Sequence, residues 1–123
     1  MSAPPRRIGS GGPWEERVGY CRAVVANGMV HVSGSTAQGE VPPGVVEQCR
    51  SALAAIGTAL EAAGTGFDRV VRVRYILPDR ADFEPCWPLL RETFGPHPPA
   101  ATMIVAGLID PRYRIEIEVD AAL

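Results

Sequence analysis

The stretch VGYCRAVVANGMVHVSG, residues 18–34, predicts a β-hairpin. Asn27 and Gly28 separate two apolar runs, and both residue types tolerate the positive φ of a type I′ turn. We therefore predict strands at 18–26 and 29–34. Because a hairpin buries little surface on its own, the rest of the chain must supply what packs against it.

The segments on either side of the hairpin differ in composition. Residues 1–16 are rich in Pro, Gly and Ser and are predicted to form an irregular N-terminal arm. Residues 17–123 contain no linker or internal repeat and are predicted to form a single domain.

Two helices are predicted after the hairpin. In residues 45–64, apolar side chains recur every three or four positions, and Gly64 is placed to end the helix. A shorter helix is predicted at 82–95, with Asp82 as its N-cap and Gly95 at its end. Each helix has one apolar face, which needs a sheet to pack against.

Three further strands complete the prediction. The segment 69–77 alternates apolar residues with Arg72 and Arg74, and strands are also predicted at 101–107 and 113–121. The last strand has an apolar face and an acidic face. Side chains of both charges on one face of a sheet are too polar for a dry core.

The predicted order is β-β-α-β-α-β-β, which gives an α+β fold with a mixed sheet. Crossover connections share one hand, so both helices should lie on the same face of the sheet. The opposite face then has no cover from this chain. We expect a homo-oligomer with a partly polar interior.

Composition excludes several functions. The 123 residues carry a net charge of −2, and every one of the 12 basic residues is an arginine. Without lysine there is no Schiff-base chemistry, no pyridoxal phosphate anchor and no P-loop lysine. No basic run or patch is evident, so nucleic acid is not an expected partner.

The cysteines do not indicate a metal or disulfide site. Cys21, Cys49 and Cys86 form no CxxC motif and are odd in number, so we expect reduced thiols. We expect neither a metal nor a cofactor. The N-terminus lacks the apolar core of a secretory signal, and no apolar run approaches the ~20 residues of a membrane span. A cytoplasmic location is expected, with no membrane partner.

Several motifs occur in order along the chain: GYCRAVVANGMVHVSG, LEAAG, RYILPDRADF, PPAAT and IEIEVDA. Together they resemble the Rid family of reactive-intermediate deaminases, also called the YjgF family and sometimes L-PSP endoribonucleases. The resemblance covers roughly residues 17–123. It implies chorismate-mutase-like subunits in a homotrimer, whose sheets form a central barrel with a small-molecule cleft at each subunit interface. Active members hydrolyse 2-imino acids or enamines to 2-oxo acids and ammonia, without a cofactor.

The resemblance also implies which residues form the cleft. Glu116 matches the catalytic glutamate that positions the hydrolytic water. Ala101, after the Pro-Ala corner, stands where active members have the arginine that binds the substrate carboxylate. Trp87 is expected either to pack under its helix or to line the cleft. The substrate-binding positions are predicted to be Tyr20, Ser33, Gly34, Trp87, Ala101 and Thr102.

The missing arginine changes the expected substrate. Loss of one partner of an arginine–carboxylate pair inside a cleft costs about 3–5 kcal/mol, so an ordinary 2-imino acid should bind poorly. Another cation could replace it, and the candidates are Arg22, Arg74 and Arg114.

Three functions remain. The first is hydrolysis of a reactive imine, enamine or related metabolite with altered specificity, for which Glu116 argues. The second is a non-catalytic trimer that binds a metabolite or a partner protein, for which Ala101 argues. The third is an endoribonuclease, which the acidic balance disfavours because RNA cleavage requires neutralisation of phosphates.

Overall fold

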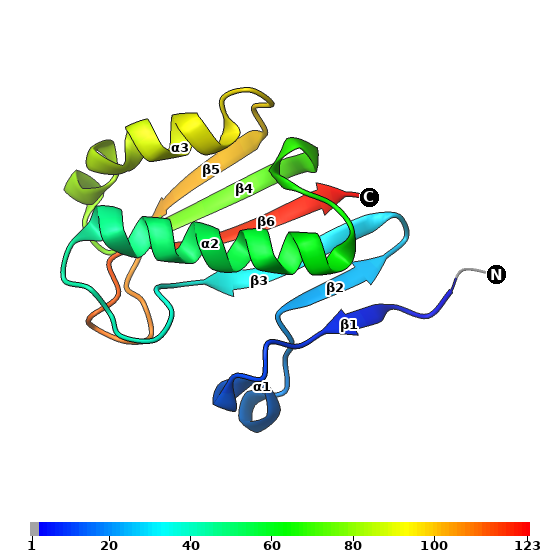
Figure 1. Cartoon of the computed structure of the whole chain (residues 1–123). Helices are drawn as coiled ribbons and strands as arrows, with labels where there is room; N and C mark the ends of the chain where they lie inside the picture. Colours follow the sequence, from blue (N-terminus) through cyan, green and yellow to red (C-terminus); the bar gives the residue numbers. More distant parts are fainter. Residues whose placement is uncertain (1–2) are drawn as a thin grey trace.

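A mixed six-stranded sheet forms the body of the protein (Figure 1). The computed structural model describes residues 3–123. The strand order is β1-β2-β3-β6-β4-β5, in which β4 and β5 are parallel and the other neighbours antiparallel. The strands are β1 (Arg6–Ile8), β2 (Ala23–Ala26), β3 (Met29–Ser35), β4 (Val70–Leu77), β5 (Ala100–Val105) and β6 (Glu116–Ala122).

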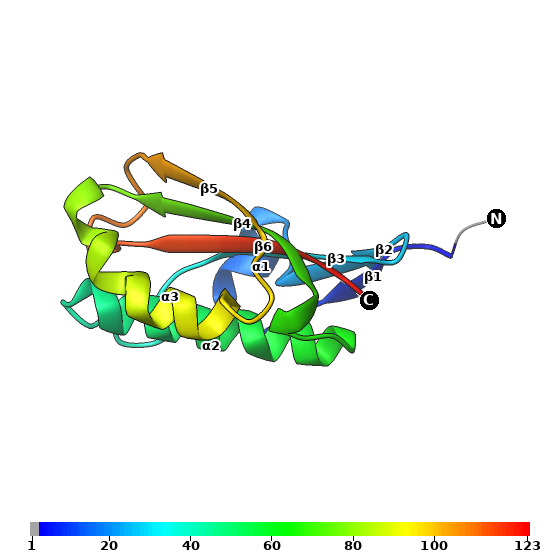
Figure 2. The ribbon, with the colours of Figure 1, turned by 90° about the horizontal axis from the view of Figure 1, so that it is seen from above.

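Helices α2 (Val45–Ala63) and α3 (Trp87–Phe94) lie on the same face of this sheet (Figure 2). Gly64 ends α2 with a φ of 89°, which glycine adopts without steric cost. The predicted α+β class, with a mixed sheet and both helices on one face, is confirmed.

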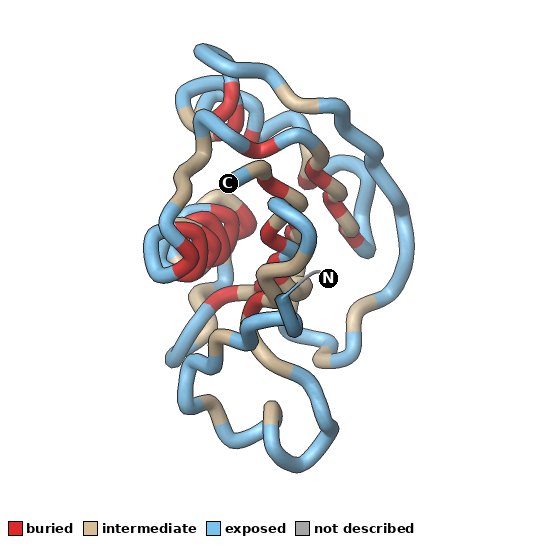
Figure 3. The backbone as a smooth tube through the Cα atoms, turned by 90° about the vertical axis from the view of Figure 1, so that its right-hand side faces the viewer, coloured by how far each residue is buried: buried red, intermediate tan, exposed pale blue. Residues whose placement is uncertain are grey.

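The hydrophobic core fills the space between α2 and the central strands. Ile56 and Leu60 of α2 are fully buried against Ile117 and Val119 of β6. Figure 3 shows the buried residues concentrated on α2 and on the strands that it covers. The alternation in β6, with every second residue buried, matches the predicted apolar face of the last strand.

The second helix is shorter than the predicted 82–95. Two 3-10 turns, Arg80–Asp82 and Glu84–Cys86, precede α3, which begins at Trp87 with Pro88 in its first turn. The predicted N-cap, Asp82, is wrong. Its side chain is buried and paired with an arginine, and Asp79 instead caps the first turn by accepting from the Ala81 N–H at 2.9 Å.

The N-terminal segment is more ordered than predicted. β1 pairs with β2, and α1 (Pro13–Val18) occupies part of the stretch that we predicted as arm and strand. Pro13 opens α1 because its fixed φ suits the first helical turn, and Gly19 ends it at a φ of 93°. The strand predicted at 18–26 therefore begins only at Ala23. We call residues 6–18 the arm from here on.

The sheet face opposite α2 carries polar side chains, and we call it the open face. Arg74 of β4 pairs with Glu118 of β6 at 3.0 Å, and the His31 ring lies 2.7 Å from Asp120. Beside them, every residue of β5 is exposed. Helices α2 and α3 both lie on the opposite face, so neither covers these side chains (Figure 2).

Candidate functional site

A cavity of about 870 Å³ lies between the arm, the loop after β3 and the start of β6. Trp14 and Val18 of α1 form one wall, and Ile109 forms another. Tyr20 and Glu116 also line this cavity. We call it the first pocket. It brings together three predicted site residues, namely Tyr20, Gly34 and Glu116.

Glu116 is the predicted catalytic residue of the first pocket. Burial raises the pKa of its carboxyl above the usual 4.5, the charge of Glu118 raises it further, and Arg22 opposes the shift. A carboxyl group with a raised pKa exchanges protons more readily near neutral pH, as a general acid and base must. Its environment therefore suits the role implied by the family resemblance.

Gly34 shapes the seat of Glu116. A Cβ added to Gly34 would lie 2.6 Å from Glu116 Oε2 and 2.9 Å from its carboxyl carbon. Any side chain there would displace the carboxylate, so glycine is required by close approach rather than by a positive φ. Gly34 thus positions Glu116 by leaving space for it.

Arg22 lies at the same place. Its Nη2 donates to the Gly34 carbonyl at 2.7 Å, and its guanidinium carbon lies 5.9 Å from the Tyr20 ring centroid. Its Nε is buried and has no hydrogen-bond partner among residues 3–123. None of the ion pairs in this part of the chain includes Arg22. It is a cation beside the predicted catalytic residue without a bound anion.

A second pocket, of about 370 Å³, lies between α3 and β5. Ala101 and Trp87 both line it. The Trp87 side chain is 48% exposed and meets Phe83 edge-on, with ring centroids 6.2 Å apart, so the residue lines a pocket rather than packing under its helix. Ala101 pairs with Val73, whose side chain is buried on the helix-covered face.

One chain therefore does not bring Ala101 and Glu116 together. Ala101 lies in the second pocket on the helix-covered face, whereas Glu116 lines the first pocket and belongs to the open face. A site containing both would need two subunits.

The last two predicted residues lie outside both pockets. The Ser33 hydroxyl donates to the Cys21 carbonyl at 2.7 Å, which ties β3 to the segment before β2. Thr102 is on the open face, where its hydroxyl accepts from Arg72 Nη1 at 3.2 Å. Neither contact involves Glu116.

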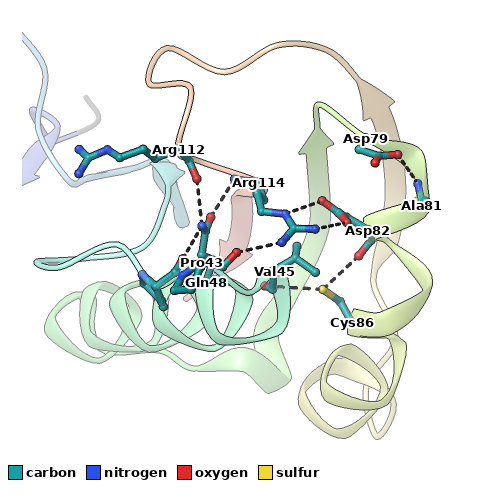
Figure 4. A network of polar contacts seen from close by, with 10 residues as sticks. Pro43, Val45, Gln48, Asp79, Ala81, Asp82, Cys86, Arg112 and Arg114 are labelled. Atoms are coloured by element: carbon teal, nitrogen blue, oxygen red, sulfur yellow. Dashed lines mark hydrogen bonds and ion pairs between the residues drawn. The ribbon is translucent and has the colours of Figure 1, made fainter.

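Arg74 and Arg114, the other candidate cations, are already paired. Arg74 bonds Glu118 on the open face. Arg114 grips the buried Asp82 through Nε at 2.9 Å and Nη2 at 2.7 Å, and Nη1 donates to the Pro43 carbonyl (Figure 4). Neither is available to hold a ligand in the first pocket.

A buried glutamine supports the same region. Gln48 of α2 donates to the carbonyls of Pro42 and Arg112 at 2.7 and 3.0 Å, and accepts from the Arg114 N–H at 2.8 Å (Figure 4). All its hydrogen-bonding groups are engaged, so it fixes the loop that leads into β6. The network thereby fixes the residues that precede β6, which begins at Glu116.

Sequence reasoning missed the wall that the arm provides. The signal was present, because Pro13 followed by Glu15 and Glu16 is typical of a first helical turn. The Pro, Gly and Ser around it favoured an irregular segment instead. Ile109 was missed because nothing in a turn sequence indicates what the turn will face.

No cluster of three His, Cys, Asp or Glu that could hold a metal ion occurs within residues 3–123. The three cysteines are free thiols, of which Cys49 and Cys86 are buried. None of the helices in the described part of the chain has the length and apolarity needed to cross a membrane.

Comparisons with known proteins find relatives that match nearly the whole chain. A protein of Streptomyces coelicolor, SCO2049, is 37% identical over 121 residues, which cover 94% of this chain and 90% of the relative. The 2-iminobutanoate/2-iminopropanoate deaminase of Capra hircus is 34% identical, with 96% of this chain and 90% of the relative covered. The crystal structure of Rv2704 from Mycobacterium tuberculosis, a member of the YjgF/YER057c/UK114 family, has a TM-score of 0.90 at 33% identity and covers 98% of this chain and 100% of that one.

The family model described as Endoribonuclease L-PSP matches residues 14–123, which include most of α1 and most of the residues that line the two pockets. The chain thus belongs to the L-PSP endoribonuclease family, which is the YjgF or Rid family.

Proposed function

We propose that this protein hydrolyses a reactive imine or enamine, with a specificity that differs from that of arginine-bearing family members. The active unit is a homotrimer in which the first pocket of one subunit faces the second pocket of its neighbour. This assembly unites Glu116 with the neighbour's Ala101 and Trp87. It also covers the open face and the exposed strand β5, which one chain leaves bare.

The environment of the Glu116 side chain is the observation that carries the proposal. The carboxyl group is half-buried, its pKa is raised by burial and by Glu118, and it lies against Gly34 in a ligand-sized cavity. Relatives that are 2-iminobutanoate/2-iminopropanoate deaminases support the same class of reaction.

The chemistry follows from one proton acceptor. Water adds to the imine carbon while Glu116 takes one of its protons and passes it to the imine nitrogen, which gives a neutral carbinolamine. Glu116 then takes the hydroxyl proton and delivers it to the nitrogen, the C–N bond breaks, and ammonia leaves as the carbonyl forms. For an enamine, protonation of carbon first gives the imine. No redox change occurs, and the glutamate is regenerated.

The replacement at Ala101 changes which imine is accepted. Alanine cannot form the charge-assisted pair that an arginine makes with a carboxylate. Small 2-imino acids, whose binding depends on that pair, should therefore be hydrolysed slowly. Specificity must come from other groups in the cleft.

The test is release of ammonia and carbonyl product from imines made in place by an amino-acid oxidase. Glu116→Gln should reduce the rate to background. The matched control is Glu61→Gln, which removes a carboxylate from an exposed position on α2, outside both pockets. Equal rates for wild type and Glu116→Gln on every imine tried would reject the proposal.

A non-catalytic binding protein is the second candidate, and Ala101 is the observation that favours it. In that case the trimer would bind a small molecule or a partner protein without consuming it. Saturable binding of a 2-oxo acid together with no turnover of any imine would decide for it.

A further inference from the structure

Arg22 is a half-buried cation in the first pocket that lacks an anion. Its Nη2 reaches only the neutral carbonyl of Gly34, and its Nε has no acceptor among residues 3–123. Buried or half-buried charges in proteins are normally paired. A ligand that brings a negative group would supply the missing partner.

The acidic side chains in the pocket do not serve this purpose. Glu15 accepts from the Ser10 N–H at 3.1 Å and from its hydroxyl. Asp110 is gripped by Arg112 at 2.8 Å. Burial and the charge of Glu118 raise the pKa of Glu116, whereas Arg22 lowers it. None of these three carboxylates forms an ion pair with Arg22 within 4.0 Å.

Arg22 is also in the right place relative to Glu116. Both groups meet at Gly34, where one bonds the carbonyl and the other lies against the Cα. In a 2-imino acid the carboxylate is bonded directly to the imine carbon. The group that holds the carboxylate must therefore lie within a few ångströms of the group that delivers water, and Arg22 satisfies this condition within one subunit.

Part of the pocket wall is apolar and exposed. Trp14 is 60% exposed, Val18 70% and Ile109 96%, and all three line the cavity together with polar residues. Large apolar side chains beside convergent polar groups are typical of ligand sites. The volume of about 870 Å³ far exceeds the space that a four-carbon imino acid fills.

We propose that the ligand of this cleft is a 2-imino acid, or its 2-oxo acid product, that carries a bulky aromatic or aliphatic group. Arg22 binds its carboxylate in place of the arginine absent at Ala101. Trp14, Val18 and Ile109 receive the bulky group. This assignment rests on the proposed function, because it names the substrate class of the same cleft.

Calorimetric binding of three probes tests the assignment without any turnover. The probes are 3-phenyl-2-oxopropanoate, the small acid 2-oxobutanoate, and the neutral ketone 4-phenylbutan-2-one. The wild-type protein should bind the phenyl acid about tenfold or more tighter than either of the others, since each of them lacks one of the two recognised groups.

Two substitutions assign the contacts. Arg22→Gln should weaken the phenyl acid about ten- to hundredfold and leave the neutral ketone unchanged, because only the acid uses the charge. Trp14→Ala should reduce the preference for the phenyl acid and leave 2-oxobutanoate unchanged. The matched control is Arg50→Gln, which removes the same charge from an exposed position on α2.

Arg22→Lys covers the case in which Arg22→Gln fails to fold. It keeps the charge but not the forked donor, and it should bind the phenyl acid with intermediate affinity. Equal affinity of the wild type for the acid and the ketone would overturn the role of Arg22, and so would unchanged binding in Arg22→Gln. Equal affinity for 3-phenyl-2-oxopropanoate and 2-oxobutanoate would show that the apolar wall does not bind the bulky group.

The two proposals fail in different ways. If Arg22-dependent binding is found but Glu116→Gln hydrolyses as fast as the wild type, the binding assignment holds and the hydrolase proposal falls. If turnover depends on Glu116 but ligand binding is unchanged in Arg22→Gln, the hydrolase proposal holds and the binding assignment falls.

Discussion

Glu116 and Gly34 are in contact across neighbouring strands, and the carboxylate of Glu116 occupies the space where any other residue at position 34 would have its Cβ. The position of the Glu116 carboxylate thus depends on residue 34 of β3 having no side chain. The same glycine accepts the hydrogen bond of Arg22 through its carbonyl. Glu116 and Arg22 therefore both contact Gly34.

Gly34→Ala should remove activity while the fold survives. The Cβ would displace the carboxylate by about 1 Å, which costs about a hundredfold in rate when a reacting group is misplaced. The cost in free energy of unfolding should be small, because the atoms that must move are the end of the flexible Glu116 side chain. Imine hydrolysis and thermal melting measure both. The control is Gly107→Ala, because an added Cβ there meets nothing within 4 Å. Full activity in Gly34→Ala would contradict the assigned seat.

Glu116→Gln should stabilise the protein at neutral pH. The folded state raises the pKa of Glu116 above 4.5, so it favours the protonated form. Stability is therefore fully present below pH 4.5 and falls as the pH rises through the folded-state pKa. Glutamine mimics the neutral acid, and its advantage should grow with pH over that window. Melting temperatures from pH 4 to 8 give the comparison. A stability advantage of Glu116→Gln that shrinks as the pH rises would contradict this prediction.

Arg114→Gln should destabilise the fold without changing ligand preference. The variant leaves the buried carboxylate of Asp82 without its two donors, which costs about 1–3 kcal/mol. The control is Arg112→Gln, because the Arg112 pair with Asp110 is exposed and should contribute much less to stability. Urea unfolding compares the two variants. Equal losses would show that the Asp82 pair is no stronger than a surface pair.

The protein should be a trimer in solution, with a mass about three times the 13.1 kDa of one chain. Ile104 lies on the exposed strand β5, paired with Ile76 of the open face, and a charge there should dissociate the trimer. Light scattering of Ile104→Asp tests this. Ala54→Asp places the same charge on the exposed side of α2 and should leave the mass unchanged. A monomeric wild-type protein at micromolar concentration would remove the basis of an inter-subunit cleft.

Ala101→Arg should raise hydrolysis of small 2-imino acids. The residue is exposed in the second pocket, where an arginine has room beside Trp87 and Met103. The gain should require Glu116, so Ala101→Arg combined with Glu116→Ala should return to background. A folded trimer of Ala101→Arg that gains neither turnover nor binding of 2-oxobutanoate would show that the cleft is built for something else.

The sequence predicted those parts of the fold that depend on local periodicity. The Asn27–Gly28 turn, the apolar stripe of α2 and the alternation of β6 each reflect which face of an element is buried. It failed at the arm, where Pro and Gly were interpreted as signs of an irregular segment although Pro13 and Gly19 delimit a helix. Local composition does not show whether a short segment finds a strand to pair with.

The site was only partly predictable for a related reason. Motif matching identified Glu116, Tyr20 and Gly34, which the structure places in one pocket. It could not show that Arg22 is unpaired while Arg114 is bound to Asp82, because pairing depends on long-range geometry. Nor could it show that Ala101 lies on the opposite face of the sheet from Glu116.

The arm has a consequence for how this family can diversify. It joins the sheet through only three residue pairs between β1 and β2, yet α1 supplies one wall of the first pocket. α1 itself has no buried residue, so its composition can change without disturbing the core under α2. A chimaera that carries α1 of a relative on this sheet should bind the ligand side chains that the donor protein binds, while Glu116 and Arg22 stay where they are. Selectivity and reactivity would then be separable parts of one small chain.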